Sequence, residues 1–421
     1  MEEILMVYPD QDRKTVHIRH NHVNPRQAKK KRKVIISSVV ICAAAALILA
    51  GTFLGWGSAI AGGFSRAGDA VASLFSGGAV EKDSSSNEAA SDSGDSQDTS
   101  QTQQQTRQQL PVTVTLTGDV DLSPYVTTNY DAGGIDAVVA PDLRSQLADS
   151  DLLEINHEFA LTNGGTAADK TYTLRADPSY VSILTDLGVD VAGLANNHTL
   201  DFGAEGLNQT FATLSGAGIS YTGAGTSLED ASKLVVIEKN GRKIGFLAAS
   251  RVIPYSNWDV RNAQPGIFTC YDPTDLIADV SAAKASCDDL FVCVHWGTER
   301  TTQLSDYQTQ MAHQLIDAGA DAVIGAHPHV LQGMEYYNGK LICYSLGNFI
   351  FNQTIDQTAV MQFTIASDGT ISARAIPAFA SSATTQLASG DTAAAIYQTI
   401  ANLSPTVSVD FSSGNITPAA Q

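Results

Sequence analysis

Charged residues are scarce in this chain, and basic residues are the scarcer kind. Only 16% of the 421 residues are charged, with 25 Lys and Arg against 44 Asp and Glu. Nine of the basic residues lie within residues 1–33 and three within 62–110, which leaves 13 for residues 111–421 against 33 acidic residues. A body with a net charge of −20 argues against nucleic acid as a partner. This charge does not exclude an anionic substrate, because bound divalent cations would make the electrostatic potential at the site positive.

Cysteine is also rare, with five residues in the chain. Cys293 and Cys343 stand within apolar, strand-like runs, where burial as small hydrophobic side chains is the default. Cys270 and Cys287 have more polar surroundings, and an extracytoplasmic location would permit a disulfide between them. The cysteines therefore give little information on the fold.

A long run without charge stands near the N-terminus. Residues 34–61 contain no Asp, Glu, Lys or Arg and directly follow the basic segment 26–33. The run is long enough to cross a bilayer as a helix, and the basic segment predicts a cytoplasmic N-terminus, residues 1–33. A cleaved signal peptide is the alternative, although the run is long for one and begins late. Residues 62–110, rich in Ser, Gln and Thr, are expected to form a flexible linker.

Strand-like and helical patterns alternate from residue 111 onward, which favours parallel strands with helices on the faces of the sheet. Helices are predicted over residues 137–147, 180–187, 203–217, 276–285 and 303–318. Asn240-Gly241 and Asn338-Gly339 predict hairpins, and a further strand pair spans 359–376. Together these patterns predict an α/β fold with two mixed sheets packed face to face. Residues 381–421 are expected to hold a helix near 391–401 and a polar tail.

Polar residues follow five strand-like runs at the point where each run ends. They are Gly118-Asp119-Val120-Asp121, Asn156-His157-Glu158, Asn196-Asn197-His198, His295-Trp296-Gly297 and Gly325-Ala326-His327-Pro328-His329. In open α/β sheets the functional site gathers beyond the carboxyl ends of the strands. An extended backbone would project both imidazoles of the last segment from one side. One convergent site is therefore predicted.

The residue types indicate a metal site. Carboxylates mixed with imidazoles and an amide suit Mn²⁺, Fe or Zn²⁺. Two adjacent divalent metals can supply a hydroxide and clamp both oxygens of an in-line displacement at phosphorus. Such a site needs about six protein ligands. The predicted ligands are Asp119, Glu158, Asn197, His295, His327 and His329.

Other polar residues have narrower expected roles. His198, next to a ligand, is placed to protonate a leaving alkoxide. Asp201 either orients His198 or caps the helix that begins near Gly203. Asp121 is either an outer ligand or a turn residue, and His157 is expected in a loop rather than on a metal. His313 falls inside a predicted helix and is expected to be structural.

Several motifs resemble the CapA family, linked to poly-γ-glutamate capsule biosynthesis and similar to calcineurin-like metallophosphoesterases. The motifs are Gly118-Asp119, Asn156-x-Glu158, Ala195-Asn196-Asn197-His198-x-x-Asp201-x-Gly203-x-x-Gly206-Leu207, Gly223-x-Gly225, His295-Trp296-Gly297-x-Glu299, Gly325-x-His327-Pro328-His329-Val330 and Gly347-Asn348-Phe349. The resemblance covers roughly residues 112–380, and the CapA-like domain that it implies spans residues 111–380. It implies a four-layer αββα sandwich, a two-metal site, and an extracellular catalytic domain on a single-pass membrane anchor.

The chain departs from the family pattern at the expected substrate rim. The metallophosphoesterase opening Asp-x-His is Asp119-Val120-Asp121 here, so one metal would lose an imidazole or gain a carboxylate. Arg300 replaces a residue that is commonly Tyr. The natural substrate can therefore differ from the family's namesake polymer.

The resulting hypothesis is a metal-dependent hydrolase that acts in the synthesis, export or processing of an anionic extracellular polymer. Its partners would be that polymer or a phosphoester substrate, the membrane, and subunits of a capsule synthase. Two alternatives stay open. The protein can bind or transport the polymer without catalysis, or hydrolyse cell-wall amides.

Overall fold

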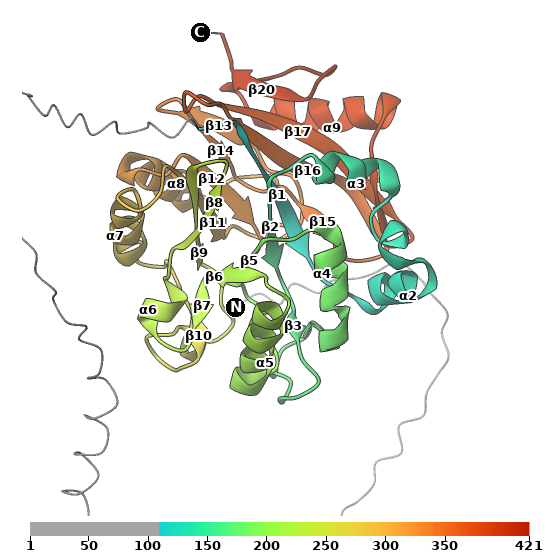
Figure 1. Cartoon of the computed structure of the whole chain (residues 1–421), viewed down its shortest axis with the longest axis vertical. Helices are drawn as coiled ribbons and strands as arrows, with labels where there is room; N and C mark the ends of the chain where they lie inside the picture. The colour runs from blue at the N-terminus through green and yellow to red at the C-terminus, as the bar shows by residue number, and fades with distance from the viewer. Residues whose placement is uncertain (1–108, 421) are drawn as a thin grey trace, which may run out of the picture. The chain divides into compact units, whose positions relative to one another are not determined.

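Two β-sheets pack face to face in the part of the chain that the computed structural model describes, residues 109–420 (Figure 1). The larger has ten strands: β1 (Val112–Val120), β2 (Leu152–His157), β5 (Val191–Gly193), β6 (Ser220–Thr222), β15 (Asn348–Ile350), β16 (Thr354–Ile365), β17 (Ile371–Ser381), β18 (Thr384–Leu387), β19 (Val407–Val409) and β20 (Asn415–Pro418). The smaller has six: β8 (Val235–Lys239), β9 (Arg242–Ser250), β11 (Asp289–His295), β12 (Ala322–Ala326), β13 (Met334–Tyr337) and β14 (Lys340–Cys343). Two strand pairs lie apart: β3 (Ala160–Leu161) with β4 (Arg175–Ala176), and β7 (Ala224–Gly225) with β10 (Gly266–Ile267).

The small sheet has a parallel centre with antiparallel edges, and in the large sheet the parallel strands form one half and end at the edge strand β6. β1, β2, β5 and β6 run parallel, as do β9, β11, β12 and β14. The predicted hairpins β8–β9, β13–β14 and β16–β17 are confirmed. Asn240 and Gly241 have φ of 53° and 81°, and Asn338 and Gly339 have 48° and 75°. Asn-Gly turns favour this left-handed conformation, whose twist matches the flanking strands.

Helices pack against the faces of the sheets. They are α2 (Pro124–Gly133), α3 (Pro141–Ala148), α4 (Val181–Leu187), α5 (Gly203–Gly216), α6 (Leu228–Ala231), α7 (Thr274–Ala283), α8 (Asp306–Ala318) and α9 (Gly390–Leu403). Figure 1 shows α7 and α8 beside the six-stranded sheet, and α4 and α5 on the side of β2 and β5. Short 3₁₀ turns occur at Gly134–Ala137, Pro178–Tyr180 and Ser256–Trp258.

Three apolar clusters hold these layers together. Leu116, Phe246 and Phe291 belong to the cluster between the two sheets. Strand residues pack against α4 and α5 on one outer face, and against α7 and α8 on the other. Burial of this kind contributes roughly 25 cal/mol per Å² of apolar surface. The fold is a mixed α/β sandwich, which confirms the prediction at that level.

Some features were not indicated by the sequence. The segment after Ser123 forms α2, with Pro124 at its first position, where a missing N–H costs nothing. The expected polar tail contains β19 and β20, and β20 pairs with β17. Cys270 and Cys287 are buried and free, so the disulfide that the sequence left open does not form.

No helix within residues 109–420 is long and apolar enough to cross a membrane. The predicted span at 34–61 lies outside the described residues, together with the predicted cytoplasmic segment and almost all of the linker.

Candidate metal centre

The carboxyl ends of five parallel strands bring the predicted site residues together. Asp119 lies near the end of β1, Glu158 directly follows β2, and His295 ends β11. Asn197 and His198 follow β5, while His327 and His329 follow β12. β1, β2 and β5 belong to the large sheet and β11 and β12 to the small one, so the site spans the edge of the sandwich.

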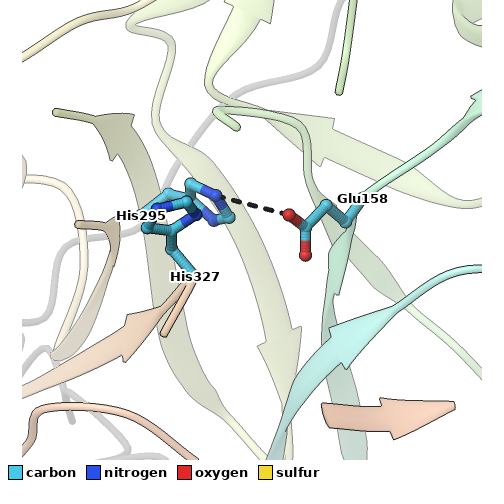
Figure 2. A group of neighbouring side chains, drawn as sticks. All are labelled: Glu158, His295 and His327. Carbon is cyan, nitrogen blue, oxygen red and sulfur yellow. Dashed lines mark ion pairs between the residues drawn. The ribbon is translucent and has the colours of Figure 1, made fainter. Parts of the chain in front are cut away.

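Glu158 is common to two groups of donor atoms. In one group its carboxylate lies with His295 and His327, and in the other with Asp119 and His329; the donor atoms of each group lie within 4.8 Å of one another. Glu158 Oε1 is 3.5 Å from His295 Nε2 and 3.9 Å from His329 Nε2. Figure 2 shows this carboxylate facing the imidazoles of His295 and His327. Glu158 is therefore the carboxylate that these two donor groups have in common.

The buried polar atoms fit a metal. Both oxygens of Glu158 and Nδ1 of His327 are buried without a hydrogen-bond partner among the residues described. Leaving such groups unsatisfied costs about 1–3 kcal/mol each. Metal coordination would satisfy them, and mixed carboxylate and imidazole donors suit Mn²⁺, Fe or Zn²⁺. The residues present therefore fit a metal centre.

The backbone of the His-x-His segment differs from the expectation. His327 and His329 have φ of 97° and 58°, so the prediction of an extended backbone is wrong. Strand β12 ends at Ala326, and the backbone N–H of His327 donates to Asp119 Oδ1 at 3.2 Å. Of the two imidazoles, that of His327 joins Glu158 and His295, and that of His329 joins Glu158 and Asp119. Positive φ at non-glycine residues often marks a functional site.

A close backbone approach holds Asp119. The amide of Asp119 donates to the carbonyl oxygen of Gly347 at 2.9 Å. A Cβ on Gly118 would lie 1.8 Å from that same oxygen, so only glycine fits there.

Three asparagines contact the donor groups. Asn197 Oδ1 lies 2.8 Å from His295 Nε2, which brings this predicted ligand to the group that contains His295. Asn156 Nδ2 donates to Asp119 Oδ1 at 2.8 Å, and Asn348 Oδ1 lies 2.8 Å from His329 Nδ1. Partners of this kind fix the orientation of metal ligands. The sequence motifs contained Asn156 and Asn348 but assigned them no role.

His198 is held by Asp201. The His198 Nδ1 to Asp201 Oδ2 distance is 2.7 Å, and the Asp201 side chain is fully buried. Phe202, not Asp201, occupies the N-cap position of α5, and no side chain caps this helix. Of the two roles considered for Asp201, this geometry fits the orientation of His198.

Burial and neighbouring carboxylates raise the pKa values of two carboxylic acids of the site. Burial and the neighbouring Asp119 carboxylate raise the pKa of Glu158 well above its usual value. Burial, with Asp201 nearby, raises the pKa of Asp121 to about 8. These acids lack enough cationic partners within the described residues, which is the situation that bound cations relieve.

The imidazoles divide into two kinds. Burial lowers the pKa of His295 well below its usual value and lowers that of His327 to about 4, so both are neutral and able to coordinate. Burial also lowers the pKa of His329, but the carboxylates of Glu158 and Asp119 outweigh it and raise this pKa to about 10.

The remaining candidates lie around these groups. Asp121 is buried but belongs to neither donor group, so its two roles stay open. Glu299 is exposed at the rim of the site, where its carboxylate forms a third donor group with His327 and His329. The neighbouring Arg300 has a φ of 59°, and its amide donates to the Pro328 carbonyl at 2.8 Å.

The two remaining histidines lie outside the donor groups. The prediction that His157 lies in a loop is wrong, because it is the last residue of β2 and stacks on Phe159 at 3.9 Å between ring centroids. Burial lowers its pKa to about 3. His313 lies in α8, where its Nε2 is 2.9 Å from Glu335 Oε1.

Comparisons with known proteins agree on one family. The model of the bacterial capsule synthesis protein PGA_cap matches residues 113–353. The PGA biosynthesis protein CapA of Bacillus subtilis (strain 168) is 34% identical over 268 residues, which cover 62% of this chain and 69% of that protein. The capsule biosynthesis protein CapA of Bacillus anthracis is 31% identical over 285 residues, covering 64% and 68%. A probable polyglutamine synthesis accessory protein of Mycobacterium tuberculosis is 38% identical over 211 residues, covering 48% and 56%. The chain belongs to the CapA-like family of bacterial capsule synthesis proteins.

Proposed function

We propose that this protein is a metal-dependent, phosphoesterase-like hydrolase that acts on an anionic polymer or its phosphoester precursor during capsule synthesis, export or processing. The observation that carries the proposal is the position of Glu158, which is buried, has no hydrogen-bond partner among the described residues and is shared by two donor groups. The sandwich is then the four-layer αββα arrangement of metallophosphoesterases.

Two divalent ions would be held by this chain's residues. Asp119, Glu158 and His329 would hold one, and Glu158, Asn197, His295 and His327 the other. When bound, such ions supply a nucleophile at neutral pH and stabilise charge at phosphorus. The chain provides these ligands at the edge of the sandwich where the donor groups lie.

His198 would hold the proton for the leaving group. Its Nδ1 faces the Asp201 carboxylate at 2.7 Å, which leaves Nε2 for the substrate. Positioned proton donors of this kind contribute about 10²–10⁴-fold to rate. Burial lowers the pKa of His198, opposed by Asp201, so transfer of the proton to a strongly basic alkoxide is favourable.

The membrane location, the substrate and the partners of the protein are also part of the proposal. A helix over residues 34–61 would anchor the protein in the membrane, with the N-terminus inside and the catalytic domain outside. The relatives named for capsule and PGA biosynthesis support an anionic polymer as the substrate and capsule synthase subunits as partners. The net charge of −20 over residues 111–421 disfavours nucleic acid.

The test combines metal content with turnover in the full-length chain. We expect about two Mn²⁺, Fe or Zn²⁺ ions per chain and hydrolysis of bis(p-nitrophenyl) phosphate. His327→Ala should lose both metal and turnover, and His198→Ala should lose turnover but keep metal. His313→Ala, a histidine outside the site, is the matched control and should lose neither. Metal without turnover in the wild-type chain would favour polymer binding without catalysis, and an absence of metal would refute the proposal.

A further inference from the structure

Lys170 is a cation directed inward from an otherwise exposed segment. It lies in the connection 162–174 between β3 and β4, most of which is exposed. Its own side chain is only 14% exposed. No sequence motif indicated a role for this residue.

The Lys170 ammonium group contacts the segment that carries His198. Nζ lies 2.5 Å from Asp201 Oδ1 and donates to the backbone carbonyl of Asn197 at 2.6 Å. It also lies 3.2 Å from His198 Nδ1 and 5.2 Å from the ring centroid of Trp258. One side chain therefore contacts the predicted proton donor, its carboxylate partner and the backbone of a predicted ligand.

The Asp201 carboxylate is satisfied from three directions. Its Oδ1 forms an ion pair with Lys170 at 2.5 Å, and its Oδ2 accepts from the Leu174 amide at 2.6 Å and from His198 Nδ1 at 2.7 Å. The backbone carbonyl of Asp201 also accepts from the Ala168 amide at 2.8 Å. Asp201 thus ties the 162–174 connection to the His198 segment.

These contacts place the one proton of neutral His198 on Nδ1, so Nε2 is the nitrogen that takes up the second proton and gives it to the leaving group. A lysine ammonium only donates, and an ionised carboxylate only accepts. A distance of 2.7 Å between Nδ1 and a carboxylate oxygen requires a proton between them, so that proton sits on Nδ1. Lys170 supplies the cation that pairs with this fully buried carboxylate.

We propose that Lys170 is a positioning residue for His198: it holds the Asp201 carboxylate and the Asn197 carbonyl, and so keeps Nε2 of His198 directed toward the leaving group. The inference rests on the proposed function, in which His198 is the proton donor. Lys170 acts through Asp201. Its ammonium group lies against Asp201, Asn197 and His198.

Lys170→Met removes the charge and keeps the length of the side chain, and Lys284→Met is the matched control. Lys284 Nζ pairs with the largely buried Asp321 at 2.8 Å, and Lys284 lies outside the site. Both variants are made in the full-length chain, with metal content, kcat and KM measured. Two phosphodiester substrates are compared, one with a p-nitrophenolate and one with an alkoxide leaving group.

A proton-donor defect has a distinct kinetic signature. We expect Lys170→Met to lower kcat at least about tenfold for the alkoxide substrate and much less for the p-nitrophenolate, with KM and metal content unchanged. In a His198→Ala background, Lys170→Met should cost nothing further. Lys170→Arg should restore part of the loss. Equal losses on both substrates that add to those of His198→Ala would refute the inference, as would full activity of Lys170→Met.

A second measurement does not depend on turnover. In the metal-loaded full-length chain, Lys170→Met should speed hydrogen exchange in the peptide over 163–174, which contains the Ala168 and Leu174 amides, and Lys284→Met should not. Unchanged exchange would refute the anchoring by Lys170. An inactive wild-type chain, or a fully active His198→Ala variant, would instead refute the proposed function. In that case the hydrogen-exchange result would still decide whether Lys170 anchors Asp201.

Discussion

Glu158→Gln should be at least as stable as the wild type without metal, but less stable than the wild type when metal is added. In the metal-free protein, burial and Asp119 raise the pKa of Glu158 well above its usual value. A raised pKa means that the stability contributed by the neutral acid is complete below the unfolded-state pKa and is lost as pH rises through the folded-state pKa. Glutamine removes that ionisation, so metal-free Glu158→Gln should match or exceed the wild type near neutral pH, by about 1–2 kcal/mol.

Metal should favour the wild type instead. Ligand at 100 times its dissociation constant stabilises a protein by about 2.7 kcal/mol. At about 2–4 °C per kcal/mol, the wild-type melting temperature should rise by roughly 5–10 °C. Glu158→Gln should show a rise below about 2 °C, because a neutral amide cannot replace a carboxylate shared by both donor groups.

Thermal unfolding in EDTA and across a Mn²⁺ titration measures both effects. Glu229→Gln makes the same chemical change at an exposed position of α6, and should respond to metal as the wild type does. An equal metal-induced rise in Glu158→Gln and the wild type would refute the shared-ligand assignment. A wild-type melting temperature that responds to no divalent ion would refute the metal centre itself.

Three further variants test the surroundings of the site. Burial raises the pKa of Glu154 to about 8. The free energy of unfolding of the wild type should therefore fall by about 1.4 kcal/mol per pH unit between the unfolded-state pKa near 4.5 and pH 8. Urea unfolding should show a weaker fall in Glu154→Gln. Gly118→Ala forces a Cβ to 1.8 Å from Gly347 O, and should lower the free energy of unfolding by about 1–3 kcal/mol in the same assay. Asn348→Ala removes the partner 2.8 Å from His329 Nδ1, and should weaken metal binding about 10–100-fold by calorimetry with an unchanged fold.

Local patterns predicted the fold where one physical factor dominates. Asn240-Gly241 and Asn338-Gly339 each identified a hairpin, because few other residue pairs adopt left-handed φ twice in succession. The helix predicted over 203–217 corresponds to α5, Gly203–Gly216, whose apolar residues recur at helical spacing.

Prediction failed where tertiary packing decides the structure. β19 and β20 have only three and four residues, and they form as strands because β17 offers an edge for pairing. A short polar segment carries no signal for such a partner, since strand propensity depends strongly on context.

The site was accessible from sequence because polar residues interrupt apolar strands at one edge. That pattern identifies which residues converge, but not how each backbone turns, and the left-handed conformation of His327 and His329 was missed. Lys170 was missed for a different reason. It lies 31 positions before Asp201 in an exposed, polar connection, and only the folded chain brings its ammonium group to the carboxylate.

The charges around the site connect these observations. Lys170 compensates Asp201, which leaves the carboxylates of Asp119, Asp121 and Glu158 with a formal charge of −3. Under the proposed function two divalent cations would contribute +4, so the loaded centre would carry +1. A histidine in place of Asp121, as in the usual metallophosphoesterase opening, would make that charge +2. Asp121 thus lowers the charge of the centre by one, which weakens the attraction of a dianionic monoester twice as much as that of a singly charged phosphodiester, so it shifts selectivity toward the diester.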